Sequence, residues 1–175
     1  YVCTTLADDA RAMSPTRFHN SVHNAAAGYW TIGTGCMQAA TAIAAFDGSF
    51  AQGLVEAMAQ LHDGAEAVLL VGYDAAAVGG LASVALSTGL LGGALVLSRT
   101  PRPGAPTITM AFEDGDGDAD GALLGHARGN AMEAMLPLFD ALATGAGVAR
   151  LRAGPGRALR LQIVHTAAAK VAAHA

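Results

Sequence analysis

The sequence predicts an α/β fold, in which helices and strands alternate along the chain. Two continuous apolar runs of strand length, Ala67 to Tyr73 and Ala94 to Ser98, indicate central strands covered on both faces. Other segments carry apolar residues every three or four positions, which is the helical period. The alternation of these two patterns is typical of layered α/β proteins.

The clearest helix is predicted from about Gly48 to Leu61. Its apolar residues share one face: Phe50, Leu54, Ala57, Met58 and Leu61. Asp47 stands where a helix N-cap belongs, since its side-chain oxygen can accept from free amides of the first turn. The apolar run Ala39 to Ala45 predicts a short buried strand before it. A strand, a tight turn and a helix start therefore meet at Asp47.

The remaining elements follow from similar patterns. Tyr1 to Met13 is predicted to be the tail of a helix that Ser14-Pro15 stops, because proline disfavours helix in the residue before it. Arg99 to Pro106 contains three prolines and predicts a linker. The other predicted segments are a helix at Ala25 to Thr34, an irregular glycine-rich segment at Asp74 to Gly93, strands at Thr107 to Phe112 and Ala158 to Val164, a helix at Met132 to Ala143, and a frayed helix from Thr166.

Composition excludes some functions and favours others. The 175 residues are 53% hydrophobic and carry a net charge of -4, which gives no electrostatic basis for binding nucleic acid. Little charged surface is left, so an apolar face is expected to meet a partner chain. Ala75 to Leu97 has membrane-like hydropathy, but its five glycines favour a buried strand with loops over a membrane span. Basic residues are scattered, apart from a loose group at Arg150, Arg152, Arg157 and Arg160.

The cysteines and the start of the chain give two further expectations. Cys3 and Cys36 are too few for a disulfide framework, which favours a reducing cytoplasmic location. The sequence opens at Tyr1 without a methionine, which predicts a fragment or a processed piece that lacks earlier elements.

Two motifs suggest a metal site, but each lacks a required ligand. Asp116 to Gly121 matches the first half of a calcium loop, yet Ala127 stands where the loop needs a bidentate glutamate. A solvated acidic turn is the expected structure. His19 and His23 are four residues apart and can share a metal on a helix, but no third ligand follows. The sequence therefore predicts no metal and no cofactor.

Nucleophile and nucleotide motifs are also incomplete. Ser49 lacks the glycines of G-x-S-x-G, so a local role in the first helical turn is favoured. Cys36 precedes a predicted strand and has apolar neighbours, a setting in which cysteine is usually structural. Neither G-x-G-x-x-G nor a P-loop occurs, so nucleotide binding has no support.

Two segments, Ser14 to Trp30 (SPTRFHNSVHNAAAGYW) and Phe46 to Ala57 (FDGSFAQGLVEA), resemble β-ketoacyl synthase-like proteins of the thiolase superfamily. The resemblance is closest to the short chain-length-factor-type subunits of aryl polyene and related type II polyketide or fatty acid systems. It covers roughly Leu6 to Ser98, and the rest only loosely. It implies a thiolase-like layered αβαβα fold, reduced in size, as one domain over residues 1–175. Within that domain, 1–98 would be the half that carries the nucleophile, 99–106 the linker and 107–175 a shortened second half.

The resemblance places Asp47 where active ketosynthases carry the acyl-accepting cysteine. Such enzymes also need two histidines in H-G-T-type and G-H-type motifs, and His126, His165 and His174 stand in no such context. The implied protein is a non-catalytic subunit in the cytoplasm that pairs with an active ketosynthase and helps to shape its product tunnel. It would meet acyl carrier protein only indirectly.

The resemblance also implies the surfaces that such a subunit would use. Phe46 and Met58 are tunnel candidates, and strand Ala39 to Ala45 should face the partner. Two alternatives remain open: a divergent acyl transferase or decarboxylase that uses Cys36 or His23, and a homodimeric thiolase-fold binding or structural protein. The residues implied at the partner interface are Phe18, His19, Asn20, Ser21, His23, Asn24, Tyr29 and Trp30, of which the two last could also support the tunnel.

Overall fold

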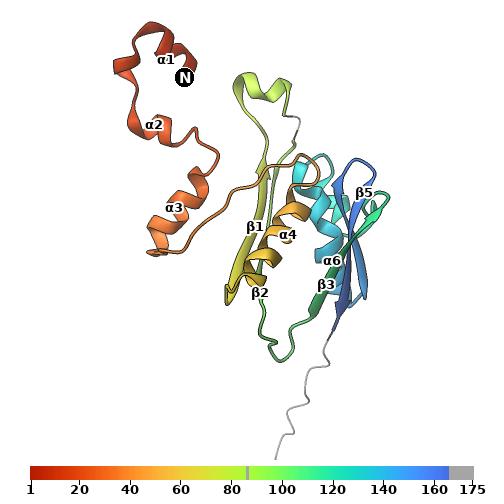
Figure 1. The fold of residues 1–175 in the computed structure, drawn as a ribbon. Helices are drawn as coiled ribbons and strands as arrows, with labels where there is room; N and C mark the ends of the chain where they lie inside the picture. The colour runs from red at the N-terminus through yellow and green to blue at the C-terminus, as the bar shows by residue number, and fades with distance from the viewer. Residues whose placement is uncertain (86, 166–175) are drawn as a thin grey trace, which may run out of the picture. The chain divides into compact units, whose positions relative to one another are not determined.

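The computed structural model describes residues 1–85 and 87–165, and it mixes helices and strands as the α/β prediction expects (Figure 1). Contacts divide the chain into two compact units, Tyr1–Ile43 and Ala44–Ala175. The division lies at Ile43, not within the predicted linker 99–106. The assignment of 1–98 and 107–175 to two halves of one domain stays a prediction.

The first unit is helical, and none of its helices contains a buried residue. The predicted helix tail ends early, at Asp8, and Ser14-Pro15 begins a helix where the sequence predicted a stop. The Ser14 hydroxyl accepts from the Arg17 amide at 3.4 Å and Pro15 takes the first helical position, a combination that favours a helix start. The elements are α1 (Val2–Asp8), the 3₁₀ turn η1 (Ala10–Ala12), α2 (Pro15–His19) and α3 (Ala25–Thr34), the last as predicted.

The strand predicted at Ala39 to Ala45 does not form. These residues are irregular and almost all exposed, and their one strand-like contact is an isolated bridge between Ala45 and Asp47. A strand needs a neighbour to satisfy its backbone amides and carbonyls. No ladder among the described residues includes this segment, so its apolar composition alone does not make it a strand.

The second unit holds all the described strands. The helix predicted from Gly48 and the strands predicted near 67, 94, 107 and 158 are confirmed, whereas β4 was not predicted. Pro137 lies at the start of α6 and divides the helix predicted at 132–143 into η3 and α6. The frayed helix predicted from Thr166 lies outside the described residues. The elements are α4 (Ser49–His62), β1 (Ala67–Ala75), η2 (Gly79–Ser83), β2 (Leu90–Ser98), β3 (Thr107–Asp114), α5 (Leu124–Ala127), η3 (Ala131–Met135), α6 (Leu136–Thr144), β4 (Val148–Gly154) and β5 (Arg157–Val164).

Two antiparallel sheets enclose the two longest helices of this unit (Figure 1). Strands β1 and β2 pair with Val71 opposite Ala94, and β3, β5 and β4 form the second sheet in that order. Helix α4 contacts β1 and β2 on one side and β4 on the other, while α6 contacts β4 and β5. The largest fully buried side chains, which define the core between the sheets, are Leu54, Met135, Leu138, Leu151, Leu159 and Leu161.

The apolar runs in β1 and β2 were predicted to be covered on both faces, and this is wrong. Burial alternates along both strands, so only the face toward α4 is covered. The reason is the pairing: the two strands form an antiparallel hairpin, which can leave one face open, and not part of a parallel sheet covered by crossover helices. Within the described residues no helix is both long and apolar enough to cross a membrane.

A buried asparagine fixes the end of this hairpin to the rest of the unit. Asn130 is 3% exposed, and its side-chain amide donates to the carbonyls of Thr88 at 2.9 Å and Asp74 at 3.4 Å. Its side-chain oxygen accepts from the Met132 amide at 3.0 Å. Every polar atom of this side chain is therefore used to hold β1, the approach to β2, and η3 together.

Candidate functional site

A single serine makes two hydrogen bonds in the turn before α4, one as acceptor and one as donor. The Ala45 amide donates to Ser49 Oγ at 2.8 Å, and the Ser49 hydroxyl donates to the Phe46 carbonyl at 2.6 Å. This confirms the local role expected for Ser49. Phe46 lies between them with φ 49°, a left-handed conformation that costs a non-glycine residue about 1 kcal/mol or more.

Asp47 is not the N-cap of α4, and the sequence-based assignment is corrected here. The N-cap is Gly48, and no side chain caps the helix start. The Asp47 carboxylate instead accepts from Arg152 Nη1 on β4 at 3.1 Å, with the aspartate side chain 67% exposed. The guanidinium offers a charge-assisted hydrogen bond. The carboxylate therefore turns toward β4 and away from its own helix.

Close backbone packing brings this turn against β4. A Cβ on Gly48 would lie 2.8 Å from the Ala153 carbonyl oxygen, so only glycine fits there. The side-chain amide of Gln52 donates to the same carbonyl at 3.0 Å. The start of α4 is thus attached to β4 by Gly48 and Gln52 as well as by Asp47.

The turn and the end of β4 border an open hollow of about 380 Å³. Its charged groups are two carboxylates and one guanidinium, and the ring of Phe46 stands at its rim, 95% exposed. None of the lining residues is a cysteine, serine or histidine, so the carboxylates of Asp47 and Asp116 are the groups of this hollow that could act as a nucleophile or a general base. The lining residues are Ala45, Phe46, Asp47, Gly48, Asp116, Arg152, Gly154 and Pro155.

Arg152 belongs to the loose basic group seen in the sequence, and every member of that group has an acidic neighbour. Arg150 Nε lies 2.7 Å from Glu113 Oε1, and the Asp118 carboxylate accepts from the Arg150 amide at 2.8 Å. The acidic loop is therefore held to β4 by Asp118, while Asp116 and Asp120 are exposed, as expected for a solvated acidic turn. Among the described residues no group of three or more ligands could hold a metal ion. The two remaining pairs, Arg157 with Asp114 and Arg160 with Glu113, are looser.

The two weak catalytic candidates belong to the first unit. Cys36 is half-buried and follows α3, where its amide donates to the Thr31 carbonyl at 3.0 Å. His23 is exposed in the turn between α2 and α3. Both described cysteines are free thiols. Asp47, in contrast, lies in the second unit.

The segment predicted to meet a partner forms a local polar cluster with exposed aromatic rings. The Tyr29 hydroxyl donates to Asn20 Oδ1 at 2.7 Å, and the His19 ring meets the Tyr29 ring edge-on at 5.1 Å. His19 therefore packs against an aromatic ring. Ser21 donates to the Phe18 carbonyl at 2.7 Å, His23 and Asn24 are exposed, and Phe18, Tyr29 and Trp30 are each at least half exposed.

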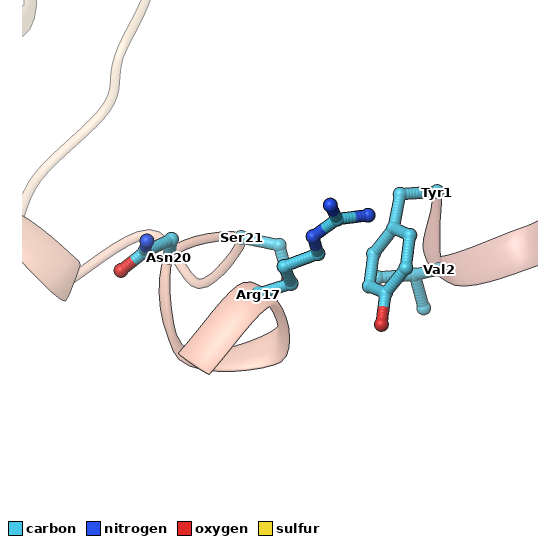
Figure 2. Close-up of a pocket in the computed structure, with 5 residues that line it drawn as sticks. All are labelled: Tyr1, Val2, Arg17, Asn20 and Ser21. Atoms are coloured by element: carbon cyan, nitrogen blue, oxygen red, sulfur yellow. The ribbon is translucent and has the colours of Figure 1, made fainter. Parts of the chain in front are cut away.

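A second hollow, of about 480 Å³, lies within the first unit (Figure 2). The Arg17 side chain reaches toward the Tyr1 ring, with the guanidinium carbon 4.9 Å from the ring centroid. The Tyr1 hydroxyl accepts from the Ser14 amide at 2.7 Å. These contacts join α1 to α2. Val2, Asn20 and Ser21 complete the lining.

The tunnel candidates differ in their surroundings. Phe46 borders the hollow beside Asp47, whereas Met58 is half-buried farther along α4 and is not among the lining residues.

Arg152 is the residue of this site that the sequence did not predict. Its position in the basic group was the only available signal, and nothing in the sequence connected it with Asp47.

A comparison with known protein families gives a match in the N-terminal part of the chain. Residues 4–100 match the family model of the beta-ketoacyl synthase N-terminal domain. The match covers more than half of the 175 residues and includes both α3 and the turn at Asp47. No curated protein and no solved structure matches the chain. The chain belongs to the β-ketoacyl synthase family.

Proposed function

We propose that this protein is a non-catalytic, chain-length-factor-type ketosynthase subunit. In this role it pairs with an active β-ketoacyl synthase and shapes its product tunnel in a type II polyketide, aryl polyene or fatty acid system of the cytoplasm. The observation that carries the proposal is the ion pair between Asp47 and Arg152, at 3.1 Å, in the position where the resemblance expects the acyl-accepting cysteine.

The chemistry of a carboxylate supports a non-catalytic role. Attack by Asp47 on a thioester would form a mixed anhydride. Such an anhydride is itself a high-energy acyl donor, so it would carry a growing acyl chain poorly. The hydrogen bond from Arg152 further stabilises the carboxylate in its unreacted form, so it weakens the nucleophile. The tight turn and the helix start of an acyl-transfer corner are present without the strand before them, and the reactive atom is replaced.

The arrangement of layers supports the thiolase-like part of the proposal. Helices α4 and α6 pack between the β1–β2 hairpin and the β3-β5-β4 sheet. A thiolase-like αβαβα fold has such a sheet–helix–sheet sandwich at its centre. The second unit would thus be a reduced form of that fold.

The first unit supplies the proposed contact with the ketosynthase partner. Phe18, Tyr29 and Trp30 are 51%, 50% and 56% exposed, and aromatic residues are enriched at protein interfaces. A unit whose helices bury none of their own residues gains most by packing against another chain. This supports placing the partner at residues 18 to 30.

The Asp47→Cys variant tests the site. A thiol there would lie beside Arg152 and at the start of α4, and both stabilise a thiolate. We expect a cysteine-reactive condensation inhibitor to add one label to this variant and none at residue 47 in the wild type, as measured by intact mass and peptide mapping. The double variant Asp47→Cys, Arg152→Ala should label more slowly, whereas Asp47→Cys, Cys36→Ala should label at the same rate.

A second measurement separates the proposal from the enzyme alternative. The wild-type chain is incubated with acyl carrier proteins that carry acyl or malonyl groups, and its mass is followed. No covalent adduct is expected. An acyl adduct on the wild type that disappears with Cys36→Ala would refute the non-catalytic role and support a divergent acyl transferase.

Co-expression tests the partner. A tagged chain is expected to retain an untagged active ketosynthase from the same gene neighbourhood, and Trp30→Ala should lower the amount retained. Thr34→Ala, which changes an exposed residue in the last turn of the same helix, is the matched control. A chain that never retains the ketosynthase would refute the pairing.

A further inference from the structure

The hollow beside Asp47 carries more negative than positive charge. It is lined by two carboxylates, those of Asp47 and Asp116, and by one guanidinium, that of Arg152. Arg152 Nη1 lies 3.1 Å from Asp47 Oδ2, so these two charges balance each other. Among the residues that the structure describes, Asp116 forms no ion pair. The charge of Asp116 is therefore the excess charge of the hollow.

The loop that carries Asp116 is attached to β4 just after this residue. The Asp118 amide donates to the Arg150 carbonyl at 2.9 Å, and the Arg150 amide donates to Asp118 Oδ2 at 2.8 Å. Strand β4 is an edge strand of its sheet, and Asp118 bonds to it as a residue of a neighbouring strand would. A Cβ on Gly117 would lie 2.5 Å from the Arg152 amide nitrogen, so the loop backbone lies directly against β4.

The loop is also attached just before Asp116. The Gly115 amide donates to the carbonyl of Gly156, in the turn between β4 and β5, at 3.0 Å. Bonds on both sides therefore hold Asp116 beside the hollow, although the residue itself is exposed. Because backbone contacts of its neighbours set this position, replacing the Asp116 carboxylate with an amide should leave the loop in place.

The charge of Asp116 acts across the whole hollow. A space of 380 Å³ is about 9 Å wide if it is taken as a sphere, whereas the Debye length is about 10 Å at 0.1 M salt. A group that enters the hollow is therefore close enough for this carboxylate to repel it if it is an anion. A neutral group of the same size meets no such repulsion.

We propose that Asp116 is a specificity-determining residue that makes this hollow select against anions. The hollow admits neutral groups, and it disfavours groups that end in a carboxylate. This inference rests on the proposed function, in which the corner at residue 47 is what remains of an acyl-transfer site. Acyl groups with a terminal carboxylate would then be kept out of the corner by Asp116 as well as by Asp47.

The Asp47→Cys variant provides a thiol inside the hollow for the test. The thiolate displaces iodide from neutral iodoacetamide and from anionic iodoacetate, so at one pH the ratio of the two rates does not depend on the fraction of thiolate. Adding Asp116→Asn should raise the rate of iodoacetate relative to iodoacetamide about threefold at about 0.05 M salt, and this increase should disappear near 1 M. Mass spectrometry of the peptide that contains residue 47 measures both rates.

The matched control is Asp120→Asn in the same Asp47→Cys background. It removes an equal charge from an exposed residue of the same loop, but one that does not line the hollow, so the ratio should stay nearly unchanged.

Three results would overturn the proposal. The first is a ratio that Asp116→Asn leaves unchanged. The second is an equal increase with Asp116→Asn and Asp120→Asn, which would indicate a general effect of surface charge. The third is a thiol at residue 47 that reacts with neither reagent, because the hollow would then be closed to small molecules. An unchanged ratio leaves the proposed function intact, whereas an acyl adduct on Cys36 of the wild type would refute that function without altering the ratio.

Discussion

The two sheets of the second unit bury one face each, yet they differ in how much of the core they carry. In the β3-β5-β4 sheet, Leu151, Leu159 and Leu161 are at most 1% exposed. In the β1–β2 hairpin the inward-facing side chains Val68, Leu70, Leu91 and Leu95 are only half-buried. The three-stranded sheet therefore contributes most of the fully buried core, and the inward-facing side chains of the hairpin are less buried.

The difference follows from strand number and from the residues available. A two-stranded antiparallel pair is marginally stable alone and depends on packing against other elements. The hairpin obtains this packing from α4 and from Asn130, which bonds to Thr88 and Asp74 at its end. Its outer face remains apolar, whereas the outer face of the larger sheet is polar.

The largest expected effect comes from a pair of matched leucine truncations. Leu161→Ala in the central strand should lower the free energy of unfolding by about 3–4 kcal/mol, because a fully buried leucine leaves a cavity. Leu95→Ala on the hairpin should cost about 1–2 kcal/mol, since its side chain is half-buried. Urea unfolding of both variants measures the difference. Equal losses would mean that the hairpin carries as much of the core as the larger sheet.

A smaller effect distinguishes the two faces of the hairpin itself. On the covered face, a Cβ on Gly72 would lie 2.6 Å from the buried ring of Phe50, so Gly72→Ala should cost about 2 kcal/mol through overpacking. On the outer face, a Cβ on Gly92 meets no atom closer than 3.8 Å. Gly92→Ala should be neutral, or stabilising by about 0.5 kcal/mol, because it restricts the unfolded chain. Thermal unfolding of the two variants at low protein concentration provides the measurement. A loss at Gly92 as large as that at Gly72 would contradict the one-sided burial.

The local elements were predictable because their signals are local. The helix α4 follows from apolar residues three and four apart, the strand near 67 from an apolar run of strand length, and the strand near 107 from the alternation of apolar and polar residues. The family resemblance rests on two continuous segments, and the family match over 4–100 agrees with it. Periodicity within one segment needs no knowledge of the rest of the chain.

Features that depend on distant partners could not be predicted. The apolar run at Ala39 to Ala45 has strand composition but no neighbouring strand among the described residues, and β4 was not predicted because Arg150 and Arg152 interrupt its apolar character. The hairpin pairing decides which face of β1 is covered, and it joins residues such as Ala67 and Ser98. Aspartate is a favoured N-cap residue, but the side chain that bonds to the Asp47 carboxylate, Arg152, lies 105 residues away on β4. The local sequence suggests a helix-cap role for Asp47, whereas tertiary packing decides that its carboxylate contacts Arg152.

The smallest expected effect tests how the turn at Asp47 is attached to the larger sheet. An N-cap role and an ion pair predict different results for Asp47→Asn, because asparagine caps a helix as well as aspartate but carries no charge. With the ion pair at 3.1 Å and both side chains largely exposed, Asp47→Asn and Arg152→Ala should each cost less than about 1 kcal/mol.

The double variant should cost little more than either single change, and the coupling should shrink as salt is raised from about 0.05 to about 1 M. Urea unfolding of the four proteins at both salt concentrations measures this cycle. Additive losses, or an Arg152→Ala variant as stable as the wild type while Asp47→Ala is weakened by about 1 kcal/mol, would restore Asp47 to the helix cap. The turn would then be attached to β4 by Gly48 and Gln52 alone.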